Sequence, residues 1–167
     1  MAGDATLDLA RLYPFARALV NSGRLSVPAV LDGSALNSPD ADAFASRMRP
    51  GSVAADAPVR HGGESGWLLN FTRSGAFTAL YFGDAPHWLR DATADLPAPL
   101  TLLCIAADSQ LGPAIGLTDT EGLAAQRYDA RPGTLVLLRP DQHVCARGRT
   151  PTLSALRAVM RRALALS

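Results

Sequence analysis

Two cysteines and three histidines are the side chains of this 167-residue sequence best suited to nucleophilic chemistry or metal binding. Cys145 lies between His143 and Arg147, two positions from each. If residues 143–147 form a strand, these three side chains share one face, and a neighbouring cation lowers the pKa of a thiol. Cys145 is therefore the candidate reactive thiol, with Cys104 as its resolving partner. An edge-strand cysteine without a function is the favoured interpretation.

The remaining residues of these types form no recognisable catalytic or metal-binding pattern. Cys104 lies in the apolar run Leu102–Ile105, where burial makes a thiol an inert core residue. The histidines at 61, 87 and 143 lack a ligand spacing such as HxxxH. The sequence contains neither the GxSxG elbow nor the GxGxxG fingerprint, and Gly62–Gly63 is a turn without a following helix. We therefore expect no metal, no cofactor bound by this chain and no catalytic residue beyond the candidate thiol.

The composition is that of one soluble globular domain, with 48% apolar and 19% charged residues. All 16 basic residues are arginines scattered along the chain, and the net charge is +1, so no nucleic-acid partner is predicted. No apolar run approaches the roughly 20 residues that span a bilayer, so no membrane association is expected. Residues 1–20 lack the basic region and apolar core of a signal peptide. We therefore expect a cytoplasmic protein with both cysteines free.

The first 66 residues are predicted to form a helix followed by an extended arm. Apolar residues recur with helical spacing over 6–21, where Pro14 predicts a kink. Residues 22–66 are rich in proline and glycine, which favours loops, with a short strand at 25–31 and a helical turn at 43–49. Because long structureless segments are uncommon in compact domains, we expect this arm to lie over the domain's own sheet or over a neighbouring subunit.

Residues 67–167 are predicted to form an α/β domain with a central mixed sheet, because a helix lies between the first two strands and a hairpin follows. The expected elements are a short helix over 67–73, a strand over 76–82, a helix over 84–96 capped by Asp84, a strand over 100–106, a short helix over 119–127, hairpin strands over 135–138 and 143–147, and a helix over 152–166. In the last strand, Val144 and Ala146 are expected on the face opposite to Cys145.

This order, with Tyr128 and Pro132–Gly133 ahead of the hairpin, resembles the C-terminal half of thioredoxin. The resemblance implies a thioredoxin-like βαβαββα fold with a loop-rich N-terminal extension. In that fold a proline, cis in thioredoxin itself, precedes the third strand, and the sequence leaves the isomer at Pro132 open. The fold performs redox chemistry in the turn after its first core strand, where a helix N-terminus stabilises a thiolate. Residues 81–88 correspond to that turn and contain no cysteine, so Asp84 is interpreted as a helix cap.

A second resemblance rests on residues 138–149. The run Leu138-Arg139-Pro140-Asp141-Gln142-His143-Val144, followed by Arg147-Gly148-Arg149, resembles the closing motif of FAD-dependent aromatic-ring hydroxylases of the phenol hydroxylase and 3-(3-hydroxyphenyl)propionate hydroxylase type. The last domain of these enzymes is thioredoxin-like. Shorter similarities lie upstream at Asn37–Asp42, Pro50–Gly51, Asp56–Pro58 and Phe77–Gly83. The resemblance implies a structural role for Pro132, Gly133, Arg139, Pro140, Asp141 and His143.

The hydroxylase resemblance implies a non-catalytic domain that serves subunit contacts and steadies flavin-binding domains. We expect a homodimer, or docking to a flavin hydroxylase, whether the chain is a separate protein or part of a longer enzyme. FAD, NAD(P)H and a phenolic substrate belong to that parent or partner enzyme, because no catalytic residue of the family has a counterpart here. Two alternatives stay open: a thiol-dependent redox enzyme using Cys145, and a small phenolic-ligand binding module enclosed by the arm at 22–66 and the aromatic cluster at 67–88.

Overall fold

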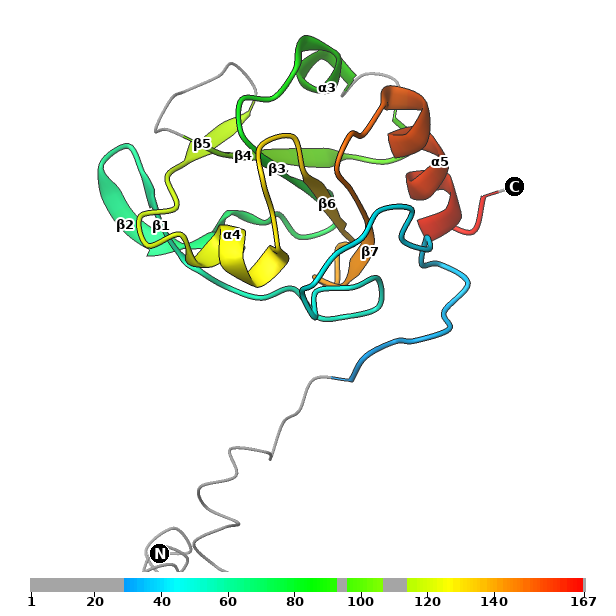
Figure 1. The fold of residues 1–167 in the computed structure, drawn as a ribbon. Helices are drawn as coiled ribbons and strands as arrows, with labels where there is room; N and C mark the ends of the chain where they lie inside the picture. Colours follow the sequence, from blue (N-terminus) through cyan, green and yellow to red (C-terminus); the bar gives the residue numbers. More distant parts are fainter. Residues whose placement is uncertain (1–28, 93–95, 107–113, 167) are drawn as a thin grey trace, which may run out of the picture.

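The computed structural model describes residues 29–92, 96–106 and 114–166, which form a mixed sheet with helices on both faces (Figure 1). The helix predicted over 6–21 lies outside the described residues, as do residues 25–28 of the predicted short strand. The described remainder of that strand, residues 29–31, has no strand structure.

Five strands form the central sheet in the order β5-β4-β3-β6-β7. They are β3 (Phe77–Phe82), β4 (Leu100–Ile105), β5 (Ile115–Leu117), β6 (Leu135–Leu138) and β7 (Val144–Gly148). β3 is parallel to β4 and antiparallel to β6, β4 is parallel to β5, and β6 and β7 form an antiparallel hairpin. The predicted mixed sheet and its order of elements are confirmed, with β5 as an additional strand.

The two faces of the sheet bury separate apolar clusters because side chains alternate along each strand. In β3, Phe77 and Ala79 face one cluster, whereas Leu80 and Phe82 face the other. The first cluster is covered by α3 (His87–Asp91) and α5 (Leu153–Ala163), and the second by α4 (Leu123–Tyr128). This three-layer arrangement leaves the carboxyl ends of the parallel strands β3 and β4 close to α4.

Helix α3 is much shorter than the helix predicted over 84–96. It begins at His87 with Pro86 as its N-cap and no side-chain cap, so the prediction that Asp84 caps it is wrong. Pro86 has an extended backbone (ψ 157°), which places Asp84 ahead of the first turn and exposed to solvent. Residues 93–95 lie outside the described part of the chain.

The other two helices take their caps from side chains. Asp119 accepts hydrogen bonds from the backbone N–H groups of Ala124 (3.2 Å) and Ala125 (2.9 Å), which have no partner within the first turn of α4. Thr152 accepts one from Ala155 N–H at the start of α5.

A second hairpin was not predicted. β1 (Pro58–His61) pairs with β2 (Glu64–Trp67), and a short 3₁₀ helix, η2 (Leu68–Phe71), follows within the predicted short helix over 67–73. Gly62 and Gly63 form its turn with φ of 56° and 85°, as a type I′ turn requires at both central positions. Arg60 and Thr118 exchange backbone hydrogen bonds of 2.9 Å, so this hairpin extends the sheet beyond β5.

Residues 38–54 of the arm lie on the domain's own sheet, along the outer edge of β7. Ser38 N–H donates to the carbonyl of Cys145 (2.8 Å), and Gly51 N–H donates to that of Val144 (2.7 Å). Val144 N–H in turn donates to the carbonyl of Ser52 (2.8 Å). The helical turn predicted at 43–49 is absent, because this stretch forms bends against the edge. The arm therefore covers an edge strand that would otherwise be open to other chains.

Candidate functional site

The turn between β6 and β7 is held by an ion pair within the closing motif. Arg139 donates from Nε and Nη2 to the two carboxylate oxygens of Asp141 at 3.2 and 2.8 Å, and the Asp141 carboxylate also accepts His143 N–H (3.1 Å). Burial raises the pKa of Asp141, but the hydrogen bonds from Arg139 and His143 outweigh it and lower that pKa overall. Pro140 lies between the paired residues. Four of the predicted motif residues thus form one turn.

Pro132 and Gly133 form the entry to β6. The Arg131–Pro132 peptide is trans. Gly133 has φ 94° and donates its N–H to the carbonyl of Phe82 (2.8 Å). A Cβ at this position would lie 3.3 Å from the carbonyl oxygen of Arg149, which is closer than an ordinary van der Waals contact. A glycine is therefore required by both the backbone conformation and the close approach. These two residues border Gly83, in the turn that carries the redox pair in thioredoxin.

Cys145 does not share a face with Arg147, because Arg147 pairs with Val136, whose side chain lies in the other apolar cluster; that part of the prediction is wrong. Leu137 pairs with Ala146 and Leu138 with Val144, which leaves Cys145 as the extra residue of a β-bulge. The bulge reverses the alternation: Val144 enters one cluster, whereas Cys145 and Ala146 enter the other. The prediction that Val144 and Ala146 share a face is wrong for the same reason.

Cys104 and Cys145 are both buried in the apolar cluster beneath α3 and α5, and each of the two cysteines is 1% exposed. Burial raises the pKa of the Cys145 thiol from 9.0 to about 12, against an opposing effect of Arg139. Burial also raises the pKa of Cys104. The Cys145 Sγ is a donor to the carbonyl of Leu137 (3.4 Å). Near neutral pH both side chains are protonated and out of contact with solvent.

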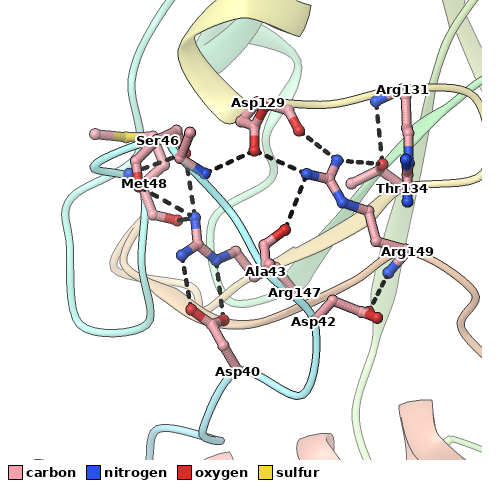
Figure 2. A network of polar contacts seen from close by, with 11 residues as sticks. Asp40, Asp42, Ala43, Ser46, Met48, Asp129, Arg131, Thr134, Arg147 and Arg149 are labelled. Atoms are coloured by element: carbon pink, nitrogen blue, oxygen red, sulfur yellow. Dashed lines mark hydrogen bonds and ion pairs between the residues drawn. The ribbon is translucent and has the colours of Figure 1, made fainter.

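A network of polar contacts joins the arm to the end of β7 and to the loop after α4 (Figure 2). The guanidinium of Arg147 donates to both carboxylate oxygens of Asp40, at 2.9 and 2.6 Å, and also to Ser46 Oγ and to the carbonyl of Met48, both at 3.1 Å. Its side chain is 4% exposed. The closing motif therefore binds the arm through a nearly buried ion pair.

Arg149 makes a parallel set of contacts beside Arg147. Its guanidinium donates to the carboxylate of Asp129 (2.7 Å), to the backbone carbonyl of Asp129 and to that of Ala43 (3.3 Å), while its own N–H donates to Asp42 (2.7 Å). The N–H of Ala45 and the guanidinium of Arg149 lower the pKa of Asp129. The loop after α4 is thereby tied to the same segment of the arm.

The aromatic ring of Phe44 completes this network. The guanidinium carbons of Arg147 and Arg149 lie 4.2 and 3.9 Å from its centroid, within the range of cation–π contact. We call Asp40, Asp42, Phe44, Arg147 and Arg149 the arm clamp. The sequence analysis identified the segments Asn37–Asp42 and Arg147–Arg149 separately and did not indicate that they contact each other. Nothing in the sequence around Phe44 indicated a role for its ring, apart from the two acidic residues that precede it.

The remaining polar candidates lie apart. His61 contacts the carbonyl of Gly116 (2.8 Å), and His87 is exposed on α3 near Arg90. Within residues 29–92, 96–106 and 114–166, no group of three His, Cys, Asp or Glu side chains is placed to hold a metal ion. No helix in the same ranges combines the length and apolarity needed to cross a membrane.

The aromatic residues predicted as a cluster over 67–88 are distributed between core and surface. Phe77 and Phe82 are buried in opposite clusters, and Phe82 packs on Tyr128 with ring centroids 6.0 Å apart. Trp67, in contrast, is 52% exposed on β2. Residues 38–54 of the arm contact the β7 region at the far edge of the sheet from Trp67. Residues 58–66 of the arm, in contrast, belong to the β1–β2 hairpin that carries Trp67, and Pro58, Val59, Ser65 and Gly66 line a hollow together with its side chain.

No protein-family model and no curated protein matches the sequence, whereas several solved structures are similar to it. The flavin-dependent monooxygenase PieE, in complex with FAD and substrate, is 25% identical, with a TM-score of 0.61, over 79% of this chain and 24% of its own. Aklavinone-11 hydroxylase, in complex with FAD and aklavinone, is 25% identical, with a TM-score of 0.59, over 72% of this chain and 22% of its own. A thioredoxin-like protein from Bacteroides caccae is 19% identical, with a TM-score of 0.50, over 68% of this chain and 49% of its own.

The chain thus spans about a quarter of the length of the two monooxygenases that it matches. The similarity to these two structures confirms the predicted resemblance to FAD-dependent hydroxylases. The mixed sheet and the similarity to the thioredoxin-like protein confirm the predicted fold class.

Proposed function

We propose that the chain is a non-catalytic thioredoxin-like domain of the FAD-dependent aromatic hydroxylase family that acts in the cytoplasm. It forms a homodimer or docks onto flavin-binding domains, which supply FAD, NAD(P)H and the substrate site. The observation that carries this proposal is a fold similar to part of two flavin-dependent monooxygenases, combined with a turn after β3 that contains no thiol. A domain of this kind contributes surface and rigidity to an assembly.

The alternative of a thiol-dependent redox enzyme has less support. Thiol exchange needs a solvent-accessible thiolate. Cys145 is 1% exposed and its pKa is raised to about 12, so thiolate formation near neutral pH requires local opening of the sheet. The packing of Cys145 beneath α5 favours a role in the core.

The test is size-exclusion chromatography with light scattering, first on the chain alone and then on its mixture with a flavin hydroxylase encoded nearby in the same genome. A dimer, or a complex that changes the hydroxylase's rate of NAD(P)H-dependent turnover, is the expected result. The Cys104→Ala/Cys145→Ala variant should behave identically, because the proposal assigns no role to either thiol. A monomer that neither binds the hydroxylase nor alters its turnover would contradict the proposal, and loss of an activity in the double variant would favour the thiol enzyme.

A further inference from the structure

A hollow of about 440 Å³ lies at the carboxyl ends of β3 and β4, on the side of the sheet covered by α4. In open α/β sheets this end of the parallel strands is where ligands bind, and the volume falls within the usual range for small-molecule sites. Its walls are Phe82, Gly83, Ile105, Ala106, Asp119, Gly122, Ala125, Ala130, Arg131 and Pro132. Half of these residues are glycine or alanine, whose short side chains leave the space open.

The walls of the hollow are mostly apolar, and one charged side chain, that of Arg131, is available to contact a ligand. Phe82, Ile105 and Pro132 supply apolar surface. Asp119 is committed to α4, because its two carboxylate oxygens accept the N–H groups of Ala124 and Ala125. Among the described residues, the exposed guanidinium of Arg131 makes no hydrogen bond or ion pair; only its backbone is bonded, to Thr134.

A ligand that suits this hollow has an apolar, flat body and a single anionic group. The body replaces water against the apolar wall, and the anion gains a charge-assisted hydrogen bond from a planar guanidinium. We propose that the hollow is a binding site for small aromatic carboxylates, with the ring against Phe82, Ile105 and Ala125 and the carboxylate on Arg131. None of its residues belongs to the arm clamp.

The test is a titration of the ¹⁵N-labelled full chain with benzoate, followed by ¹H–¹⁵N correlation NMR. Saturable shifts are expected at the amides of Gly83, Ala106 and Ala125. Benzyl alcohol keeps the ring without the charge and acetate keeps the charge without the ring, so each should bind at least about tenfold more weakly. Shifts that stay linear with benzoate concentration, or that map to other parts of the sheet, would overturn the proposal.

Three variants separate the site from general effects. Arg131→Gln should weaken benzoate binding about tenfold by removing the charge-assisted hydrogen bond. Arg73→Gln, at an exposed arginine outside the walls, makes the same change in net charge and should leave binding unchanged. Ala125→Leu should abolish binding by filling the hollow from α4. Equal benzoate affinity in Arg131→Gln and wild type would refute the proposal even if the leucine variant failed to fold.

Discussion

The arm clamp predicts that two ion pairs of equal length contribute very differently to stability. Asp40–Arg147 and Asp32–Arg49 both have an oxygen–nitrogen distance of 2.6 Å. In the first pair the side chains are 26% and 4% exposed, whereas in the second they are 59% and 55% exposed. Asp40→Asn and Asp32→Asn remove the same charge, but the first pair is nearly buried and joined by two hydrogen bonds, whereas the second is exposed and joined by one.

The expected magnitudes follow from that difference. Breaking a buried pair costs about 3–5 kcal/mol, because the remaining charge has lost its partner away from water. Solvent reaches Asp40, and Ser46 and Met48 still accept from Arg147, so we expect Asp40→Asn to lower the free energy of unfolding by about 2 kcal/mol. An exposed pair is worth little, and Asp32→Asn should cost no more than about 0.5 kcal/mol.

Urea denaturation gives the free energies, and hydrogen exchange shows where the structure opens. If the arm detaches before the sheet unfolds, the amides of Gly51 and Ala54, which are bonded to the β7 region, lose protection in Asp40→Asn first. Equal losses in the two variants would refute the reasoning, because burial would then not decide the value of the pair. Unchanged protection at Gly51 in Asp40→Asn would show that the arm is held by its backbone contacts alone.

Three further predictions concern the closing hairpin and its entry. Burial raises the pKa of Cys145 to about 12, so the stability that its neutral thiol contributes is intact below pH 9.0 and declines as the pH rises toward 12. The free energy of unfolding, measured by urea denaturation, should therefore fall between about pH 8 and about pH 10.5, and it should fall less in Cys145→Ala. Gly133→Ala should lower the free energy of unfolding more than Gly63→Ala in the same assay. Both glycines have a positive φ, but only at Gly133 would a Cβ lie 3.3 Å from a carbonyl oxygen. Equal losses in the two variants would mean that backbone strain is the cause and that the close approach contributes nothing. The lowered pKa of Asp141 implies that its pairing with Arg139 stabilises the fold at neutral pH and is lost as the pH falls through that pKa. Asp141→Asn should therefore be less stable than wild type at about pH 7, by at most about 1 kcal/mol, and this difference should shrink as the pH falls below 3.8.

Elements with a strong local pattern were predictable from the sequence. The apolar run that became β4 is typical of a buried strand, and the closing hairpin was predicted as strands over 135–138 and 143–147. Helix α5 was predicted over 152–166 from the helical spacing of its apolar residues. In each case the signal that specifies the element lies within the element, so no tertiary contact is needed to find it.

The features that were missed depend on distant partners. β5 has three residues, and its strand structure comes from pairing with β4. The sequence of the β1–β2 hairpin is typical of a loop because three of its ten residues are glycines. The bulge at Cys145 changes the alternation of a strand whose composition gives no sign of it. The contact of Asp40 with Arg147 joins residues 107 positions apart, and no local pattern reports such a distance.

That separation of 107 positions has a consequence for how the protein is made. The arm leaves the ribosome before the hairpin whose edge it covers has been synthesised. At about 5–20 residues per second, Asp40 waits about 5–20 s for Arg147 to appear. During this interval the segment around Gly51 and Ser52 has unpaired backbone groups and no β7 to receive them. Docking of the arm is therefore a late step of folding, and another extended chain that reaches β7 first would compete with it directly.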